Sequence, residues 1–255
     1  MKMLGVYFSG AGNSKHCVET FVKQYDETCT AISIEAEGVP AAISVADMIV
    51  LGYPVYFSNA PKIMQDFILQ NKACFAGKKV FVIATMGLCS GDGAGCAARL
   101  LKKCGAEIAG GLHLRMPDSI GDEKVLDKTP EEKRTLVRRA EDKIASSAQK
   151  LKQGNATKEG LSFLCRMGGL MMQRLWFYTK TASYKSKPDI HKEKCVGCGI
   201  CEKLCPMKNL MIEDGKAVSR NRCTLCYRCF SHCPAKALTI LGRKVYKQHL
   251  FENLQ

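Results

Sequence analysis

The chain has 255 residues, of which 46% are hydrophobic and 24% charged, so its composition is globular and excludes a disordered or fibrous chain. At about 150 residues per domain, this length predicts one or two domains, each with its own core. Lys and Arg outnumber Asp and Glu by 38 to 24, which gives a formal charge of +14, and 15 residues are cysteine.

The sequence carries no pattern of an exported or membrane-spanning protein. No charge-free run of about 18 apolar residues occurs, and residues 1–5 lead directly into a strand pattern, so we expect a soluble, cytoplasmic protein. In a reducing compartment, cysteines serve more often as metal ligands or reactive thiols than as disulfides. Eight of the cysteines lie together between Cys195 and Cys233, whereas the others are scattered from Cys17 to Cys165.

The first predicted element is an apolar strand over residues 3–8, followed by a loop of small residues and a helix to about Tyr25. Backbone amides at a helix N-terminus, with polar side chains beside them, can hold a phosphate. The loop lacks the Walker A ending, and Lys15 stands where a dinucleotide fingerprint needs its last glycine. We predict an anion site at Ser9, Gly10, Ala11, Gly12, Asn13 and Ser14.

Four more apolar runs follow, at residues 29–34, 48–52, 80–85 and 108–114. Helical patterns near 61–72 and 92–104 alternate with them, so we predict an α/β fold with a doubly wound, five-stranded parallel sheet. The second and third strands are so close in sequence that the helix between them must be short or missing. A last helix begins at a capping box of Thr129 and Glu132 and ends at Gly154, so the domain is expected to span residues 1–154.

This pattern resembles the flavodoxins, whose sheets bind FMN at the carboxyl ends of the strands beside the topological switch point. The resemblance implies that the first loop holds the FMN phosphate and that two later loops hold the ring. Flavodoxins commonly carry threonine where this chain has Ala11, so one hydroxyl donor is missing. The expected ring contacts are Pro54, Val55, Tyr56 and Phe57 in one loop, and Thr85, Met86, Gly87, Ser90 and Gly91 in the other.

Four other side chains near these loops have more than one interpretation. Tyr53 either stacks on the flavin or packs in the core. We expect Cys89 to be an inert buried thiol and not a redox thiol, because no basic residue lies near it in sequence. Asp92 is either a helix cap or a proton donor, and His113 is either structural or catalytic. No acid/base pair is recognisable, so no catalytic residue is predicted.

Residues 155–188 are expected to form a helical connector. Its stretch from 161 to 178 is apolar except for a narrow polar stripe at helical spacing. A helix lying on a membrane surface is one interpretation. We favour a helix that packs between the two domains and fixes their separation, without a membrane.

The eight clustered cysteines form two strings with one identical pattern, Cys-x-x-Cys-x-x-Cys-x-x-x-Cys-Pro. Three thiolates at steps of three can wrap three corners of a 4Fe-4S cubane, and each repeat has the pattern of a loop, a short helix and a strand. Zinc or disulfides are the alternative, but zinc sites usually pair two CxxC knuckles across a longer finger. The strings are Cys195, Cys198, Cys201, Cys205 and Cys223, Cys226, Cys229, Cys233.

Residues 189–242 resemble the bacterial two-cluster ferredoxins, which are small α+β domains, and residues 243–255 follow as a C-terminal tail. The resemblance implies that the cysteine before each proline serves the other cluster. The expected ligand sets are Cys195, Cys198, Cys201, Cys233 and Cys223, Cys226, Cys229, Cys205. The first loop carries Gly197 and Gly199, whereas larger residues such as Leu225 and Tyr227 fill the second, so the second cluster should be the more crowded.

A flavodoxin half followed by a two-cluster ferredoxin half resembles the flavodoxin-ferredoxin fusion proteins, often called EFR-type ferredoxins and found mainly in anaerobes. The resemblance implies FMN, two 4Fe-4S clusters, and electron transfer between low-potential one-electron carriers and FMN that supplies a partner redox enzyme. Two alternatives stay open, namely a flavin-dependent reductase of a small organic substrate and a redox-sensing or structural protein. Direct use of NADH is not expected, because the dinucleotide fingerprint is missing.

The positive charge bears on the partners. Eight thiolates, two cluster cores and an FMN phosphate would lower the formal charge to about +8. Lys and Arg are spread over both halves without a nucleic-acid motif, so no nucleic-acid partner is expected. Redox partner proteins with acidic docking surfaces fit this charge, and lysine-rich solubility fits it almost as well.

Overall fold

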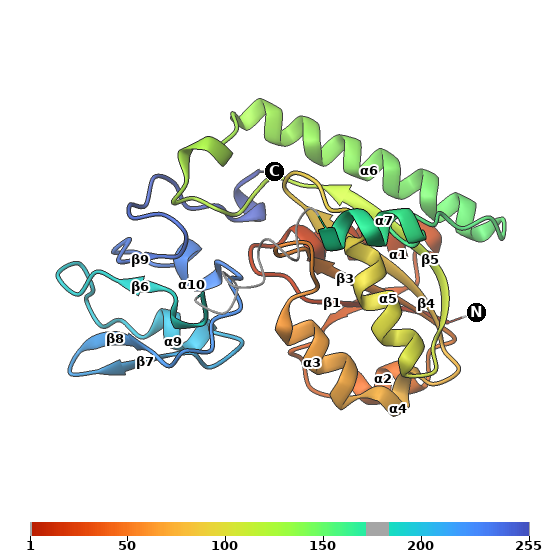
Figure 1. The fold of residues 1–255 in the computed structure, drawn as a ribbon, viewed down its shortest axis with the longest axis horizontal. Helices are drawn as coiled ribbons and strands as arrows, with labels where there is room; N and C mark the ends of the chain where they lie inside the picture. Colours follow the sequence, from red (N-terminus) through yellow and green to blue (C-terminus); the bar gives the residue numbers. More distant parts are fainter. Residues whose placement is uncertain (1, 172–183, 255) are drawn as a thin grey trace. The chain divides into compact units, whose positions relative to one another are not determined.

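The computed structural model describes residues 2–171 and 184–254 of the chain (Figure 1). Its N-terminal half alternates strands and helices, as a doubly wound fold requires. These elements are β1 (Met3–Tyr7), α1 (Asn13–Tyr25), β2 (Thr30–Ser33), α2 (Val39–Ser44), β3 (Met48–Pro54), α3 (Lys62–Gln70), α4 (Lys72–Phe75), β4 (Lys79–Met86), α5 (Gly93–Lys103), β5 (Glu107–Arg115), the 3-10 helix η1 (Lys124–Leu126) and α6 (Pro130–Lys152).

The five strands form one sheet in the order β2-β1-β3-β4-β5, and all neighbours are parallel. β1 lies between β2 and β3, so that Leu4 is opposite Thr30 on one side and Ile49 on the other. β3 and β4 are buried along almost their whole length because helices cover both faces of a parallel sheet. Each observed strand overlaps its predicted run, and the prediction of a flavodoxin-like doubly wound sheet is confirmed.

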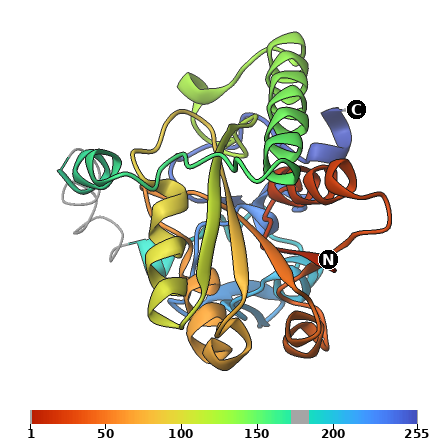
Figure 2. The same cartoon turned by 90° about the vertical axis from the view of Figure 1, so that its right-hand side faces the viewer.

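Helices cover the sheet on both sides. α1 and α6 lie over one face and α5 over the other (Figure 2), and α3 packs beside α5. His16 Nε2 of α1 lies 2.9 Å from Glu141 Oε1 of α6, which links the two helices. Between β2 and β3 the only helix is α2, with six residues, so the predicted short covering helix is confirmed.

α6 has the start and the end that its sequence indicates. Thr129 N donates to Glu132 Oε2 at 2.8 Å, and Glu132 N donates to Thr129 Oγ1 at 3.2 Å. Ile144 and Ala148 are fully buried on its apolar face. The chain leaves the helix through Gly154, whose φ of 77° is the left-handed conformation of a helix C-terminus.

The C-terminal half combines short helices with small antiparallel sheets. β6 pairs with β9 and β7 pairs with β8. α9 and α10 begin at equivalent positions of the two cysteine repeats, so the predicted short helix in each repeat is present. The elements are α7 (Phe163–Gly169), the 3-10 helix η3 (Tyr184–Ser186), β6 (Asp189–Ile190), α9 (Ile200–Leu204), β7 (Leu210–Glu213), β8 (Lys216–Ser219), α10 (Arg228–Ser231), β9 (Leu238–Thr239) and the 3-10 helix η4 (Phe251–Leu254).

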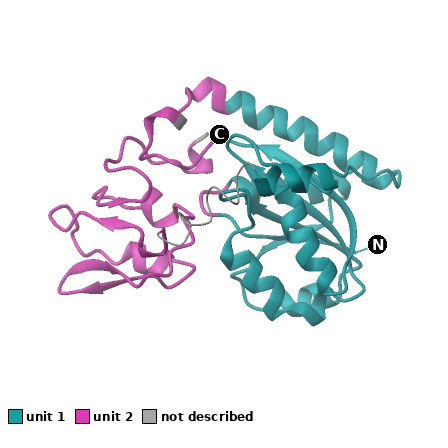
Figure 3. Cartoon of the chain, viewed as in Figure 1, with its two compact units in different colours: residues 1–9, 13–117, 134–176 teal, residues 10–12, 118–133, 177–255 magenta. Residues whose placement is uncertain are grey.

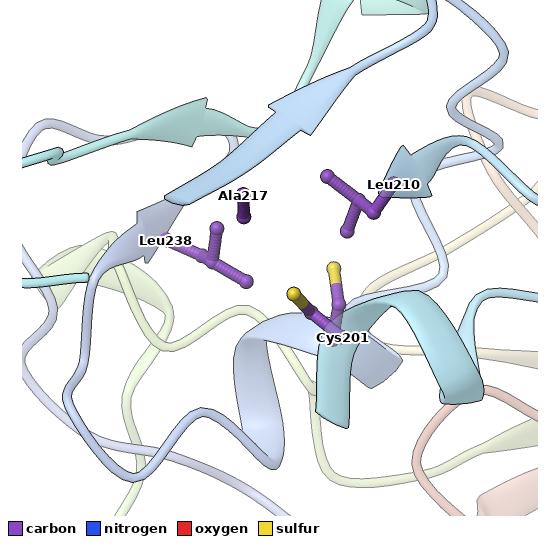
Figure 4. Close-up of a cluster of buried hydrophobic side chains, with 5 residues drawn as sticks. Cys201, Leu210, Ala217 and Leu238 are labelled. Carbon is purple, nitrogen blue, oxygen red and sulfur yellow. The ribbon is translucent and has the colours of Figure 1, made fainter. Parts of the chain in front are cut away.

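A small core in this half is built partly from cysteines. Cys201, Leu210, Ala217, Cys229 and Leu238 form one buried cluster (Figure 4). Leu210 and Leu238 hold equivalent positions in the two repeats, each at the same spacing after the last cysteine of its string. The repeats therefore share one core, and that core holds one cysteine of each string.

The chain divides into two compact units (Figure 3). The first comprises Met1–Ser9, Asn13–Pro117 and Arg134–Trp176, and the second comprises Gly10–Gly12, Asp118–Lys133 and Phe177–Gln255. The unit with the eight clustered cysteines thus also contains two segments from the N-terminal half of the sequence. The sequence domains 1–154, 155–188 and 189–242 stay predictions, because the compact units follow other boundaries.

The predicted connector helix is observed in part, as α7. Ser162 caps it, with its Oγ accepting from Cys165 N at 3.2 Å. Phe163 and Leu164 are exposed, whereas Gly169 is buried against Gly91. The continuation from residue 172 lies outside the described residues, so its packing between the domains stays a prediction. Within the described part of the chain, no helix is both long and apolar enough to span a membrane.

Candidate functional site

Two cavities in the C-terminal half are each lined by four cysteines. The first is lined by Cys195, Cys198, Cys201 and Cys233. The second is lined by Cys205, Cys223, Cys226 and Cys229. Each cavity therefore takes three cysteines from one string and the fourth from the other. Among the described residues, no three His, Cys, Asp or Glu side chains converge on a single metal ion, and these thiols stand around the cavity walls instead.

Backbone amides point at the sulfur of both exchanged cysteines. Asn209 N donates to Cys205 Sγ at 3.2 Å, and Ala237 N donates to Cys233 Sγ at 3.3 Å. Each donor follows its acceptor at the same spacing, so the two bonds are equivalent in the repeat. Hydrogen bonds of this kind stabilise the negative charge on a metal-bound sulfur.

The two cavities differ in exposure. Cys198 of the first is exposed, and its neighbour Val196 is 69% exposed. Cys226 and Cys229 of the second are buried. Tyr227, between them, is also buried, so the second loop is the more crowded one, as predicted.

Burial disfavours the charged form of these thiols. It raises the pKa of Cys201 to about 11 and the pKa of Cys223 to about 12, and the neighbouring cysteines of the same cavity add to both shifts. Because iron binds the thiolate, a bound metal would have to supply the positive charge that stabilises the ionised form.

Hydrogen bonds join the loops at the carboxyl ends of the strands in the first unit. Ser14 Oγ lies 2.7 Å from Thr85 Oγ1, and Val55 N donates to Thr85 O at 2.8 Å. Asn13 Nδ2 donates to Pro117 O at 2.8 Å, beyond the end of β5. We call these connected loops, residues 9, 13–14, 52–60, 85–93 and 117, the carboxyl rim.

A strained turn lies on the carboxyl rim. Tyr56 and Asn59 each donate a backbone N–H to the other's carbonyl at 3.0 Å. The two residues between them, Phe57 and Ser58, have φ values of 49° and 55°, a region that non-glycine residues seldom adopt. Backbone strain of this kind concentrates at binding sites.

Three buried polar atoms on the carboxyl rim have no hydrogen-bond partner within the described part of the chain. They are Asn13 Oδ1, Ser58 Oγ and Ser90 Oγ, one from each of three loops. Buried polar atoms are nearly always paired in folded proteins, so these three indicate a polar ligand at the rim.

A model of the flavodoxin domain matches residues 4–109, and a model of the 4Fe-4S dicluster domain matches residues 194–238. The chain joins a flavodoxin domain to a 4Fe-4S dicluster domain. A flavodoxin domain suggests FMN, and a dicluster domain with these cysteines suggests 4Fe-4S clusters, so the combination implies electron transfer. No curated protein matches the chain.

Solved structures similar to the flavodoxin domain include several flavodoxins. One from the domain Archaea is 17% identical with a TM-score of 0.44, over 60% of this chain and 99% of its own. Flavodoxin 2 from Bacillus cereus is 19% identical with a TM-score of 0.45, over 60% of this chain and 99% of its own. Two-electron reduced Megasphaera elsdenii flavodoxin is 24% identical with a TM-score of 0.40, over 56% of this chain and 98% of its own.

The predicted FMN contacts of the flavodoxin domain fall into two sets. Ser14, Thr85 and Met86 are buried. The others are half-buried: Ser9, Gly10, Ala11, Gly12, Asn13, Pro54, Val55, Tyr56, Phe57, Gly87, Ser90 and Gly91. Ser58, which carries one of the three oxygens left unpaired among the described residues, was not among the predicted contacts. Its position directly after Phe57 in the aromatic loop was the only sequence feature that pointed to it.

Tyr53 belongs to the core of the flavodoxin domain. It is fully buried, and its hydroxyl donates to Gly93 O at 2.5 Å and accepts from Ala97 N at 3.3 Å. Burial raises the pKa of Tyr53, so the phenol stays neutral. Of its two interpretations, packing in the core is correct.

Three further residues had more than one interpretation, two of them on the carboxyl rim and one in β5. Cys89 is exposed, so the expectation of a buried thiol was wrong: the residue lies in the loop between β4 and α5, where its neighbour Leu88 is exposed as well. Asp92 stands at the N-terminus of α5 without a side-chain capping bond, and Arg99 Nη2 donates to it at 2.7 Å instead. His113 Nε2 accepts from Ala94 N at 3.0 Å, and burial lowers the pKa of His113, so this imidazole is neutral and structural.

Proposed function

We propose that this chain transfers electrons between low-potential one-electron carriers and FMN through two 4Fe-4S clusters, and so supplies a partner redox enzyme. One observation carries the proposal: the eight cysteines sort into two cavities, each with one cysteine from the other string. Four thiols around a cavity suit the four corners of a cubane, and the exchange follows the bacterial two-cluster pattern.

The first cavity is suited to exchange with an external carrier. Cys198 is exposed, and Val196 and Ile200 beside it are 69% and 38% exposed, which forms an apolar border around the ligand loop. A carrier that docks on this border reaches the cluster edge without passing through protein. The buried Cys226 and Cys229 give the second cavity no such access.

Gly10 lies against the backbone of Cys226, one of the cysteines of the second cavity. Gly10 and Cys226 belong to the same compact unit. A Cβ placed on Gly10 would lie 2.0 Å from the carbonyl oxygen of Cys226, so only glycine permits this approach. This approach fixes the Gly10 backbone beside the ligand loop of the second cluster within the second unit.

The carboxyl rim fits FMN. The orphaned Asn13 Oδ1 can accept from a ligand hydroxyl, and the orphaned hydroxyls of Ser58 and Ser90 can donate to ring or phosphate oxygens. Asn13 Nδ2 and Ser14 Oγ are already engaged at the rim, so a phosphate would rest mainly on loop amides. When bound, FMN exchanges one or two electrons and each cluster exchanges one.

The test is the anaerobically purified full chain, with iron and FMN quantified and EPR recorded after reduction. The proposal predicts about eight iron atoms and about one FMN per chain, and two reducible clusters. Zinc in place of iron, or iron for a single cluster, would contradict it.

A further inference from the structure

The second cysteine loop has a backbone that suits glycine but carries large residues. In the first loop, Gly197 and Gly199 have φ values of 66° and 75°. Leu225 and Tyr227 hold the equivalent positions of the second loop, with φ values of 60° and 58°. L-residues with side chains are disfavoured in this left-handed region, and they persist there only when their surroundings hold them.

The surroundings of Tyr227 are specific. Its hydroxyl donates to Asp122 Oδ1 at 2.8 Å, and its ring lies edge-on to Phe230 with 5.2 Å between centroids. Tyr227 is 3% exposed and stands between the second-cavity cysteines Cys226 and Cys229. Holding its side chain therefore holds the loop that carries these ligands.

Asp122 is a fully engaged buried carboxylate. It is 1% exposed, and its second oxygen accepts from Ile240 N at 2.6 Å and from Leu241 N at 3.0 Å. A Cβ on Gly242 would lie 1.9 Å from the Asp122 carbonyl oxygen, so the two backbones approach as closely as glycine allows. Asp122 is thus fixed in place within the second unit.

We propose that Asp122 is a positioning residue for the second cluster: it holds the Cys226–Cys229 loop through Tyr227, and its buried negative charge lowers the reduction potential of that cluster. The proposal rests on the proposed function, because it requires two bound clusters. Asp122 lies outside both matched regions, 4–109 and 194–238, so neither domain model includes it.

The sign of the change in reduction potential follows from the charge of Asp122. An anion near a cluster disfavours the added electron, and burial strengthens this effect because water does not screen the charge. In the first loop the equivalent of Tyr227 is Gly199, which has no side chain to hold a carboxylate. The carboxylates nearest in sequence there, Glu193 and Glu202, are exposed to solvent. The two clusters should therefore differ in potential, with the second made the lower by Asp122.

The test is an EPR-monitored anaerobic redox titration of the full chain carrying Asp122→Asn, Asp122→Ala or Tyr227→Phe. Asp214→Asn is the matched control, since Asp214 is exposed and lies in the turn between β7 and β8. Asp122→Asn keeps an oxygen acceptor but loses the charge. We expect it to favour reduction of the second cluster by about tenfold, or about 59 mV for one electron, and to leave the first unchanged.

The other two variants test whether Asp122 and Tyr227 hold the ligand loop in position. Asp122→Ala and Tyr227→Phe should hasten loss of the second cluster in air and alter its EPR signal, while the first cluster and the control stay as in the wild type. If Asp122→Asn moves neither potential, or moves both equally, the inference is wrong although the proposed function stands. A wild-type chain with fewer than two clusters would overturn the proposed function and the inference together.

Discussion

Cys205 illustrates how single residues determine the cluster sites. It follows Cys201 closely in sequence but lines the cavity of Cys223 and its neighbours. α9 ends at Leu204, and Cys205 adopts an extended conformation with ψ 111°. Pro206 requires this, because a residue before proline is disfavoured in the helical region. The proline therefore turns the thiol away from its own string.

The exchange can be tested with Cys205→Ser. We expect iron to fall from about eight to about four atoms per chain, with the loss at the cluster of Cys223, Cys226 and Cys229. EPR of the reduced variant measures which cluster remains, and Cys29→Ser, outside both cavities, is the control. Loss of the first cluster with the second intact would reverse the ligand assignment.

Substitution of Tyr53 should lower stability, whereas substitution of Tyr56 should weaken flavin binding. Tyr53→Phe removes the partner of Gly93 O and Ala97 N, so we expect a loss of about 1–3 kcal/mol in the free energy of unfolding. Tyr56→Ala should weaken FMN and riboflavin equally, roughly threefold to tenfold, because it removes a ring contact and leaves the phosphate contact. Urea denaturation and fluorescence titration measure the two effects. A change in the FMN-to-riboflavin affinity ratio for Tyr56→Ala would disagree with this assignment.

Among the elements, the C-terminal segment, residues 243–255, is held by hydrogen bonds to other segments of the second unit. Tyr246 N and Lys247 N donate to Gly121 O at 2.9 and 3.0 Å, and Phe251 N donates to Ala11 O at 2.8 Å. Gln248 Nε2 donates to the carbonyl of Phe230 at 2.7 Å. This segment was predicted only as a tail, since most of these hydrogen bonds are made by backbone groups that leave no pattern in the sequence.

The attachment of this segment should depend on pH through His249. Burial lowers the pKa of His249 to about 4, and the positive charges of Lys133, 3.3 Å from Nδ1, and Lys247 act in the same direction, whereas Asp127 acts against them. The unfolded pKa is about 6.5, so between these values the unfolded state binds the extra proton. The contribution of neutral His249 to the free energy of unfolding is therefore fully present above about pH 6.5. It is lost as the pH falls towards 4.

Urea midpoints at pH 7 and pH 5 measure this effect, with cluster absorbance followed in parallel. His249→Gln cannot take up the proton, so we expect its midpoint to change less between the two pH values than that of the wild type. Equal changes in both proteins would show that other groups determine the pH dependence.

The elements predicted from sequence are those with local signals. The capping box at Thr129, the left-handed end at Gly154 and the apolar strands all depend on neighbouring residues, and the structure contains them. The cysteine strings could be recognised because their spacing repeats.

Asp122 had no such signal. Its partner Tyr227 is 105 residues away in the chain, and only the tertiary fold brings the two side chains together. Its two backbone donors, Ile240 N and Leu241 N, are similarly distant in sequence. The orphaned Ser58 likewise becomes notable only when its burial is known. Long-range contacts of this kind cannot be predicted from neighbouring residues.

On the scale of the whole molecule, the formal charge of +14 favours acidic partners. The bound cofactors would leave about +8. We propose that acidic one-electron carriers dock by electrostatic attraction. The association rate should then fall steeply between low and physiological ionic strength, as stopped-flow mixing with an acidic ferredoxin at several salt concentrations would measure. A rate indifferent to salt would leave the charge as a solubility feature.

The proposed function requires electrons to pass between an external carrier and FMN through the clusters. Anaerobic stopped-flow, following flavin absorbance after mixing with reduced ferredoxin, tests it most directly, with NADH as the comparison donor. We predict rapid flavin bleaching by reduced ferredoxin in the wild type, at least roughly tenfold slower bleaching in Cys205→Ser, and none with NADH. Equal bleaching in the wild type and Cys205→Ser, rapid bleaching by NADH, or turnover of a small organic substrate by the pure protein would contradict the account, and turnover would favour a flavin-dependent reductase.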